Sequence, residues 1–242
     1  MRHSILISSA RFGSNFFLRA CRRSRPRMRS LGEIFRKASD SKSFIANTLS
    51  TSEQEVIRLA SDDPFNLWTS IKSSIHDNCL TAKLYYYHQG PDSPLWAGLA
   101  QGEDRIVHLL RRNLFDAFLS REIVTKFKLW NTKNAKAHTN INLCVFLKED
   151  ELAEYIETKI SEIYWVRKKF EGYPHYHEVF FEDISLSSRV CMAVTDHIFG
   201  DPANGGDRST NDVEDSRIKS SSNVSVVENY RDVAHYDRIH VY

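Results

Sequence analysis

The chain has 242 residues, of which 41% are hydrophobic and 26% charged, and its net charge at pH 7 is +2. This length buries a substantial core and fits a single domain over 1–242, and the near-neutral charge gives no overall reason to expect a nucleic-acid partner. No apolar run reaches the roughly 18–20 residues that span a bilayer. The four cysteines are scattered and form no CxxC pair, which argues against a zinc ribbon and is typical of a reducing compartment.

Positive charge is concentrated at the start of the chain. Residues 1–37 hold ten Arg or Lys against one acid, Glu33. This concentration indicates an anionic ligand or partner nearby. A segment rich in Arg and Ser and poor in acids is also typical of a mitochondrial transit peptide, whereas nothing in it resembles a secretory signal. We expect a cytoplasmic protein, with mitochondrial targeting as the alternative.

The apolar patterns alternate between strands and helices. In chain order they predict a strand at 4–9, a helix at 14–23, a strand at 28–31, helices at 52–61 and 64–76, a strand at 80–87, a turn-rich stretch at 91–102, a strand at 105–110, helices at 114–128 and 150–170, a strand at 177–181, a flexible loop at 201–216 and a last helix at 224–234. Long crossovers between strands favour an α/β fold with a central, mainly parallel sheet flanked by helices.

The turn that follows the first strand has the composition of an anion site. Gly13 permits a sharp turn that exposes backbone N–H groups, and the next helix presents its positive end. Ser14 and Asn15 add hydrogen-bond donors, and Arg11 adds a full charge. The turn lacks GxxxxGK[ST], so a nucleotide triphosphatase fits poorly. The alternative is a solvated strand-to-helix turn.

A second candidate anion site follows the strand at 105–110. Arg112 lies at the end of this strand, and Ser120 comes eight residues later in the next helix. The two side chains could converge on one anion. Alternatively, Arg112 pairs with Asp116 and Ser120 faces solvent.

Together the two motifs resemble the sulfotransferases that use 3′-phosphoadenosine 5′-phosphosulfate (PAPS), especially the bacterial branch with the trehalose and nodulation-factor enzymes. In this resemblance Ala10–Phe16 takes the place of the 5′-phosphosulfate loop, and Arg112 and Ser120 that of the 3′-phosphate pair. Four weaker matches follow in family order: Gly32–Phe35, Thr81–Leu84, Glu178–Ile184 and Lys219–Tyr230. Departures are Phe12 and Asn15, where Ser or Thr is commoner, and Phe181, where Tyr is usual. The resemblance implies a P-loop-like three-layer fold.

The resemblance also assigns roles to residues. Those expected to bind PAPS are Ser9, Arg11, Phe12, Gly13, Ser14, Asn15, Phe16, Arg112, Ser120, Arg217 and Lys219, the last two on a segment, about 217–234, that closes over the cofactor. Those expected to take part in catalysis are Glu33, Arg11 and Lys83, together with His88, which is proposed not from the resemblance but from its place five residues after Lys83. Glu33 would be the general base, and His88 an auxiliary base or an acceptor contact. No cluster has metal-ligand spacing, so we expect metal-independent chemistry.

The expected reaction moves the sulfuryl group of PAPS to a hydroxyl or amine and releases 3′,5′-adenosine bisphosphate (PAP). The acceptor would be a carbohydrate, a glycolipid or a small metabolite, and the oligomeric state is open. The alternatives are a P-loop-like nucleotide kinase, a non-catalytic module whose basic N-terminus binds a partner or nucleic acid, and a degenerate sulfotransferase that binds PAPS without turnover.

Overall fold

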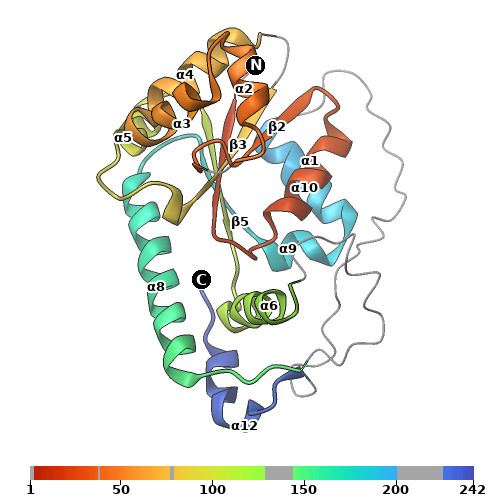
Figure 1. Cartoon of the computed structure of the whole chain (residues 1–242). Helices are drawn as coiled ribbons and strands as arrows, with labels where there is room; N and C mark the ends of the chain where they lie inside the picture. The colour runs from red at the N-terminus through yellow and green to blue at the C-terminus, as the bar shows by residue number, and fades with distance from the viewer. Residues whose placement is uncertain (1–2, 38, 77–78, 129–143, 201–225) are drawn as a thin grey trace. The chain divides into compact units, whose positions relative to one another are not determined.

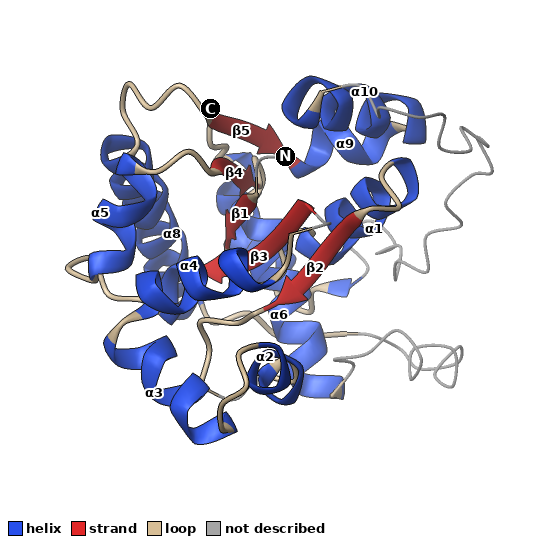
Figure 2. Ribbon diagram, turned by 90° about the horizontal axis from the view of Figure 1, so that it is seen from above, coloured by secondary structure: helices blue, strands red, loops and turns tan. Residues whose placement is uncertain are grey.

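The computed structural model describes residues 3–37, 39–76, 79–128, 144–200 and 226–242. Its described strands form one parallel sheet in the order β2-β3-β1-β4-β5 (Figures 1 and 2). They are β1 (Ser4–Ser8), β2 (Met28–Gly32), β3 (Cys79–Tyr85), β4 (Arg105–Leu110) and β5 (Tyr176–Phe180). The predicted α/β class and its central parallel sheet are therefore confirmed.

The chain divides into two compact units. The first comprises Met1–Leu110 and Trp165–Thr210, and the second comprises Arg111–Tyr164 and Asn211–Tyr242. The sheet lies in the first unit. Its central strand β1 is buried on both faces, and Ile5 and Ile7 have no exposed surface, as expected for a parallel sheet covered by helices.

Helices cover both faces of the sheet in the first unit. They are α1 (Ser14–Ser24), α2 (Lys42–Thr48), α3 (Glu53–Asp62), α4 (Pro64–Ser74), α5 (Pro94–Gln101), α9 (Phe181–Leu186) and α10 (Ser188–Phe199), with a 3₁₀ turn, η1 (Tyr86–His88), after β3. Helices α1, α9 and α10 lie on one face, and α3, α4 and α5 lie on the other (Figure 2). Ser52 caps α3, because its side chain accepts a hydrogen bond from the N–H of Glu55.

The second unit is mainly helical. It contains α6 (Leu114–Phe127), most of α8 (Glu149–Lys169), α12 (Tyr230–Val233) and the 3₁₀ turn η3 (Ala234–Arg238). Aromatic pairs join these elements: Phe118 packs on Tyr155 with ring centroids 5.2 Å apart, and Phe115 packs on Tyr230 at 6.2 Å. The acidic start and basic end of α8 complement the helix dipole.

Several predicted elements need correction. The strand predicted at 80–87 ends at Tyr85, because Tyr86–His88 turn into η1. The turn-rich stretch 91–102 contains α5, which Ser93 caps and Pro94 opens. Helices α2, α9 and α10 were not predicted. The last helix is shorter than 224–234, because Val227 forms a bridge with Val145 and the described helix starts at Tyr230. The predicted loop at 201–216 lies outside the described residues.

A hydrogen-bonded chain centred on the buried His108 of β4 joins η1 to β5. The hydroxyl of Tyr176 donates to Glu178 at 2.8 Å, so its oxygen accepts a hydrogen bond from Nδ1 of His108 at 2.6 Å. Nε2 of His108 accepts from the hydroxyl of Tyr86 at 2.7 Å. His108 is fully buried, and this burial lowers its pKa to about 3, so the ring is neutral.

No described helix is long and apolar enough to cross a membrane.

Candidate active site

The loop between β1 and α1 lies at the carboxyl edge of the parallel sheet, where α/β proteins bind ligands. Buried residues anchor it: Phe12 has no exposed surface, and its N–H donates to the carbonyl oxygen of Ser9 at 3.3 Å. Arg11 adopts a left-handed conformation, with φ of 69°, and is half-exposed. A non-glycine residue in this region costs free energy and is common at binding sites.

The first turn of α1 suits an anion. Gly13 precedes the helix with φ of 93° and has no side chain to cap it, and the first turn carries no acid. The first N–H groups of a helix have no intrahelical acceptor, and here no carboxylate in the first turn competes for them. The residues present fit a phosphate or sulfate group at this loop.

An irregularity in β2 places a carboxylate beside the next strand. Ser30 pairs with Thr81 and Gly32 pairs with Ala82, so Leu31 is an extra residue on β2. The pairing places Glu33 next to Lys83. Two side chains at the start of α2 hold this segment in place. Ser41 Oγ donates to the carbonyl oxygen of Leu31, and Lys42 Nζ donates to the carbonyl oxygen of Ile34.

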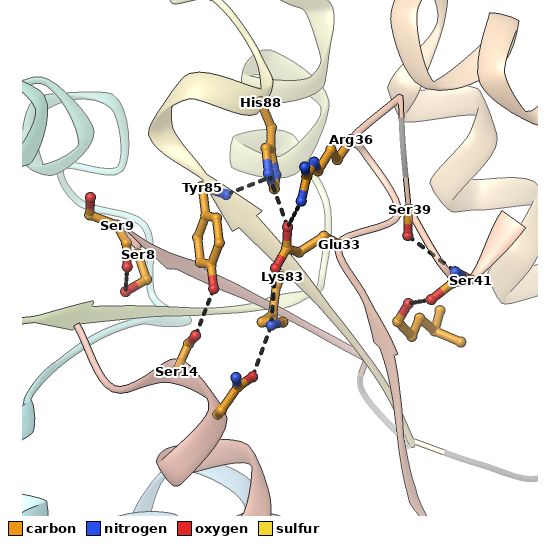
Figure 3. A network of polar contacts seen from close by, with 12 residues as sticks. Ser8, Ser9, Ser14, Glu33, Arg36, Ser39, Ser41, Lys83, Tyr85 and His88 are labelled. Carbon is orange, nitrogen blue, oxygen red and sulfur yellow. Dashed lines mark hydrogen bonds and ion pairs between the residues drawn. The ribbon is translucent and has the colours of Figure 1, made fainter. Parts of the chain in front are cut away.

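Lys83 connects this carboxylate to the loop (Figure 3). Its Nζ donates to Oδ1 of Asn15 at 3.0 Å and to Oε1 of Glu33 at 3.3 Å. The Lys83 side chain is only 9% exposed. A buried ammonium needs an anionic partner, and Glu33 supplies it.

His88 lies on the other side of the carboxylate. Its Nδ1 accepts a hydrogen bond from the N–H of Tyr85 at 3.2 Å, so the neutral ring carries its proton on Nε2. Nε2 is buried 3.6 Å from Oε2 of Glu33 and has no hydrogen-bond partner among the described residues. The ring therefore presents an N–H, and no basic lone pair, toward Glu33. This geometry favours His88 as a donor over His88 as a base.

The surroundings keep Glu33 ionised. Its pKa is lowered to about 2: the adjacent His88 lowers it most, partial burial opposes the shift, and the Lys83 ammonium lowers it further. The guanidinium of Arg36 lies 3.6 Å from Oε2 on the more exposed side. Tyr87 stands beside His88, with ring centroids 4.9 Å apart, and is 60% exposed. A cation and an aromatic ring thus lie at the open side of the carboxylate.

Known structures resemble this chain, although no protein-family model and no curated protein matches it. The sulfotransferase domain from the curacin biosynthetic pathway aligns with 85% of this chain and 76% of its own, at 13% identity and a TM-score of 0.51. The sulfotransferase domain from the Synechococcus PCC 7002 olefin synthase covers 84% of this chain and 74% of its own, at 14% identity and a TM-score of 0.48. A sulfotransferase from Alicyclobacillus acidocaldarius covers 98% of this chain and 92% of its own, at 12% identity and a TM-score of 0.48. The fold is that of a sulfotransferase domain.

Within this sulfotransferase fold, the structure brings together one group of the predicted residues. The loop residues, Glu33, Lys83 and His88 lie at the same edge of the sheet, and contacts join Asn15, Lys83 and Glu33. Arg112 and Ser120 belong to the second unit, where both are half-buried and the carbonyl oxygen of Arg112 accepts from the N–H of Val241. Arg217 and Lys219 lie outside the described residues. Among the described residues, no three His, Cys, Asp or Glu side chains gather as metal ligands.

Sequence reasoning did not single out Tyr85 as a site residue. Its hydroxyl lies 2.9 Å from Oγ of Ser14, and its backbone N–H fixes the tautomer of His88. The signal was present, because Tyr85 follows Lys83 by two residues on a strand and so lies on the same face. Arg36 was missed for another reason. Its proximity to Glu33 depends on the turn after β2, and no pattern specified that turn.

Proposed function

We propose that the chain is a PAPS-dependent sulfotransferase of the bacterial branch named above. It would move a sulfuryl group to a hydroxyl or amine of a carbohydrate, glycolipid or small metabolite and release PAP. The single observation that carries this proposal is the contact series from Asn15 through Lys83 to Glu33. It joins an anion-binding loop to an ionised carboxylate at the carboxyl edge of a sulfotransferase fold.

The loop residues would hold the donor. The N–H groups at the start of α1 and the side chain of Ser14 would bind the 5′-phosphosulfate, with Ser9, Phe12, Gly13 and Phe16 shaping the loop. Arg11 and Lys83 would offset the negative charge that the leaving phosphate gains in the transition state.

The residues outside the first unit would recognise the 3′-phosphate. Arg112 and Ser120 would bind it, and Arg217 and Lys219 would close over it. A guanidinium and a hydroxyl are suitable donors for a phosphate group. This contact would distinguish PAPS from ordinary adenine nucleotides.

Glu33 would act on the acceptor. Its carboxylate would take the proton of the acceptor as the acceptor atom bonds to sulfur and the sulfur–phosphate oxygen bond breaks, with the electron pair leaving on the phosphate. His88 would donate from Nε2, either to Glu33 or to the acceptor atom. Holding the acceptor in line with the bond that breaks supplies much of the rate.

Thermal stabilisation tests the donor assignment. PAP, 5′-AMP and ATP are compared at equal concentration, and a ligand at about 100 times its Kd adds near 2.7 kcal/mol to stability. We expect a large shift with PAP alone, and Arg112→Gln should reduce that shift while Arg22→Gln, on the exposed side of α1, leaves it unchanged. A response to ATP instead would favour the kinase. No response to any of the three would remove the proposal. The structural likeness favours neither the kinase nor the non-catalytic module.

A further inference from the structure

Lys83 has two hydrogen-bond partners that come from different parts of the site. Asn15 belongs to the first turn of α1, which faces the loop, and Glu33 follows β2 on the other side of Lys83. The lysine side chain is almost fully buried, so its ammonium cannot be satisfied by bulk water in either position. Lys83 is therefore shared between the loop and the carboxylate.

An anion in the loop would change this sharing. Among the described residues, Glu33 is the carboxylate in ion-pair contact with Lys83, and that contact is longer than the Lys83–Asn15 hydrogen bond, at 3.3 Å against 3.0 Å. A phosphate bound at the start of α1 lies on the Asn15 side and carries more charge than a carboxylate. It therefore competes with Glu33 for the same ammonium.

We propose that Lys83 couples the two halves of the site: an anion bound in the loop of residues 9–16 draws the ammonium away from Glu33, so that the carboxylate becomes an effective base only when the donor is in place. This inference rests on the proposed function, since it takes the donor to be an anion held by that loop. Lys83 is then a positioning residue for the base in addition to its contact with the donor.

The other charged and titratable groups around Glu33 remain where they are in this scheme. His88 from η1 presents its Nε2 proton, Arg36 from the turn after β2 lies 3.6 Å away, and Tyr87 stands at the rim. Lys42 from α2 is engaged with the carbonyl oxygen of Ile34. Of the cations that contact Glu33 in the described part of the chain, Lys83 also bonds the loop through Asn15, so the coupling is assigned to it.

Coupling of this kind is reciprocal. If the anion weakens the Lys83–Glu33 contact, then removing the charge of Glu33 must strengthen anion binding by the same factor. The unexpected consequence is that loss of the base tightens the binding of the product PAP. Simple repulsion between Glu33 and the anion would also tighten it, but that effect does not need Lys83.

A double-mutant cycle separates the two effects. The Kd of PAP is measured at pH 7 for the wild type, Glu33→Gln, Lys83→Met and the double variant. We expect Glu33→Gln to tighten PAP about tenfold when Lys83 is present and less than about threefold when it is replaced, a difference within the usual range of coupling. Glu55→Gln, at a partly exposed carboxylate on α3, is the matched control and should leave the Kd unchanged.

Equal tightening in both backgrounds would overturn the coupling and leave the proposed function intact. Failure of folded wild-type protein to bind PAP would remove the proposed function, and the coupling with it. Because methionine buried in place of lysine can disturb folding, the double-mutant cycle is repeated with Lys83→Gln, which puts a polar side chain at this position.

Discussion

Gly13 and Phe181 approach so closely that no side chain fits between them: a Cβ added to Gly13 would lie 2.1 Å from Cδ2 of Phe181. Gly13 also has φ of 93°, a conformation that other residues rarely adopt. The ring of Phe181 packs edge-on against Phe16 with centroids 5.9 Å apart. The turn at the start of α1 thus depends on the missing side chain and on the first residue of α9.

Gly13→Ala should destabilise the protein and weaken PAP binding. The backbone strain alone costs about 1–3 kcal/mol, and displacement of the Phe181 ring adds to it. Gly172→Ala is the matched control, because Gly172 has φ of 74° but nothing within 4 Å of the added Cβ. Urea unfolding should show a larger loss for Gly13→Ala, and Phe181→Leu should recover part of it. Equal losses of stability in Gly13→Ala and Gly172→Ala would mean that displacing the Phe181 ring costs no free energy.

Glu33→Gln should remove most of the turnover. A general base contributes about 10²–10⁴-fold, and an amide cannot take the acceptor proton. PAP release is measured at saturating PAPS with a set of hydroxylated acceptors, so that changes in donor affinity do not enter. Glu55→Gln, at a side chain that is 38% exposed on α3, should behave as the wild type. Turnover near the wild-type level in Glu33→Gln would remove Glu33 as the base.

His88→Gln should retain far more activity than His88→Ala. A glutamine amide can donate from about the position of Nε2 but cannot act as a base near neutral pH. We expect turnover within about tenfold of the wild type for His88→Gln and a larger loss for His88→Ala, with the pH–rate profile of His88→Gln keeping its shape. If both variants lose activity equally and the profile changes, His88 is a base and not a donor.

Acid should destabilise the protein through His108. Because burial lowers the pKa of His108 to about 3 in the folded state, the unfolded chain binds a proton first, near its ordinary value of 6.5. Stability contributed by the neutral ring is complete above about pH 6.5 and is lost as the pH falls toward 3, by about 1.4 kcal/mol per pH unit in the middle of that range.

Two histidine variants test this pH dependence. His108→Gln should be less stable than the wild type at pH 7, because hydrogen bonds to Tyr86 and Tyr176 are lost or lengthened. It should lose less stability than the wild type between pH 7 and pH 5. His76→Gln, at an exposed histidine, should keep the wild-type dependence in urea unfolding. Equal slopes for wild type and His108→Gln would show that another group titrates.

The strands were predictable because their signal is local. The runs Ile5–Ile7 and Ile106–Leu110, the second apolar apart from His108, are buried on both faces of a parallel sheet, and both were identified correctly as strands. The short helix α2 was missed, because seven residues with two buried hydrophobic positions give little periodicity. Helix α5 was not predicted, because Pro94 usually signals a turn. Here Pro94 occupies the first helical position instead.

The candidate site was predictable in its residue types but not in its contacts. The family resemblance proposed Glu33 and Lys83, and the spacing after Lys83 proposed His88. Nothing in the sequence specified that Lys83 also bonds Asn15, since that contact joins positions 68 residues apart. The tautomer of His88 depends on the turn that η1 makes after Tyr85. Such contacts come from backbone geometry, which a residue pattern does not encode.

The extra residue in β2 makes the site tolerant of a change in chain length at one position. Side chains on a regular strand alternate between faces, so a change of one residue ordinarily reverses the direction of everything that follows. A one-residue bulge absorbs such a change: with Leu31 deleted, Ser30 and Gly32 would pair with the consecutive residues Thr81 and Ala82, and Glu33 would still follow beside Lys83. The position of the carboxylate is therefore specified by the register after the bulge and not by the number of residues before it.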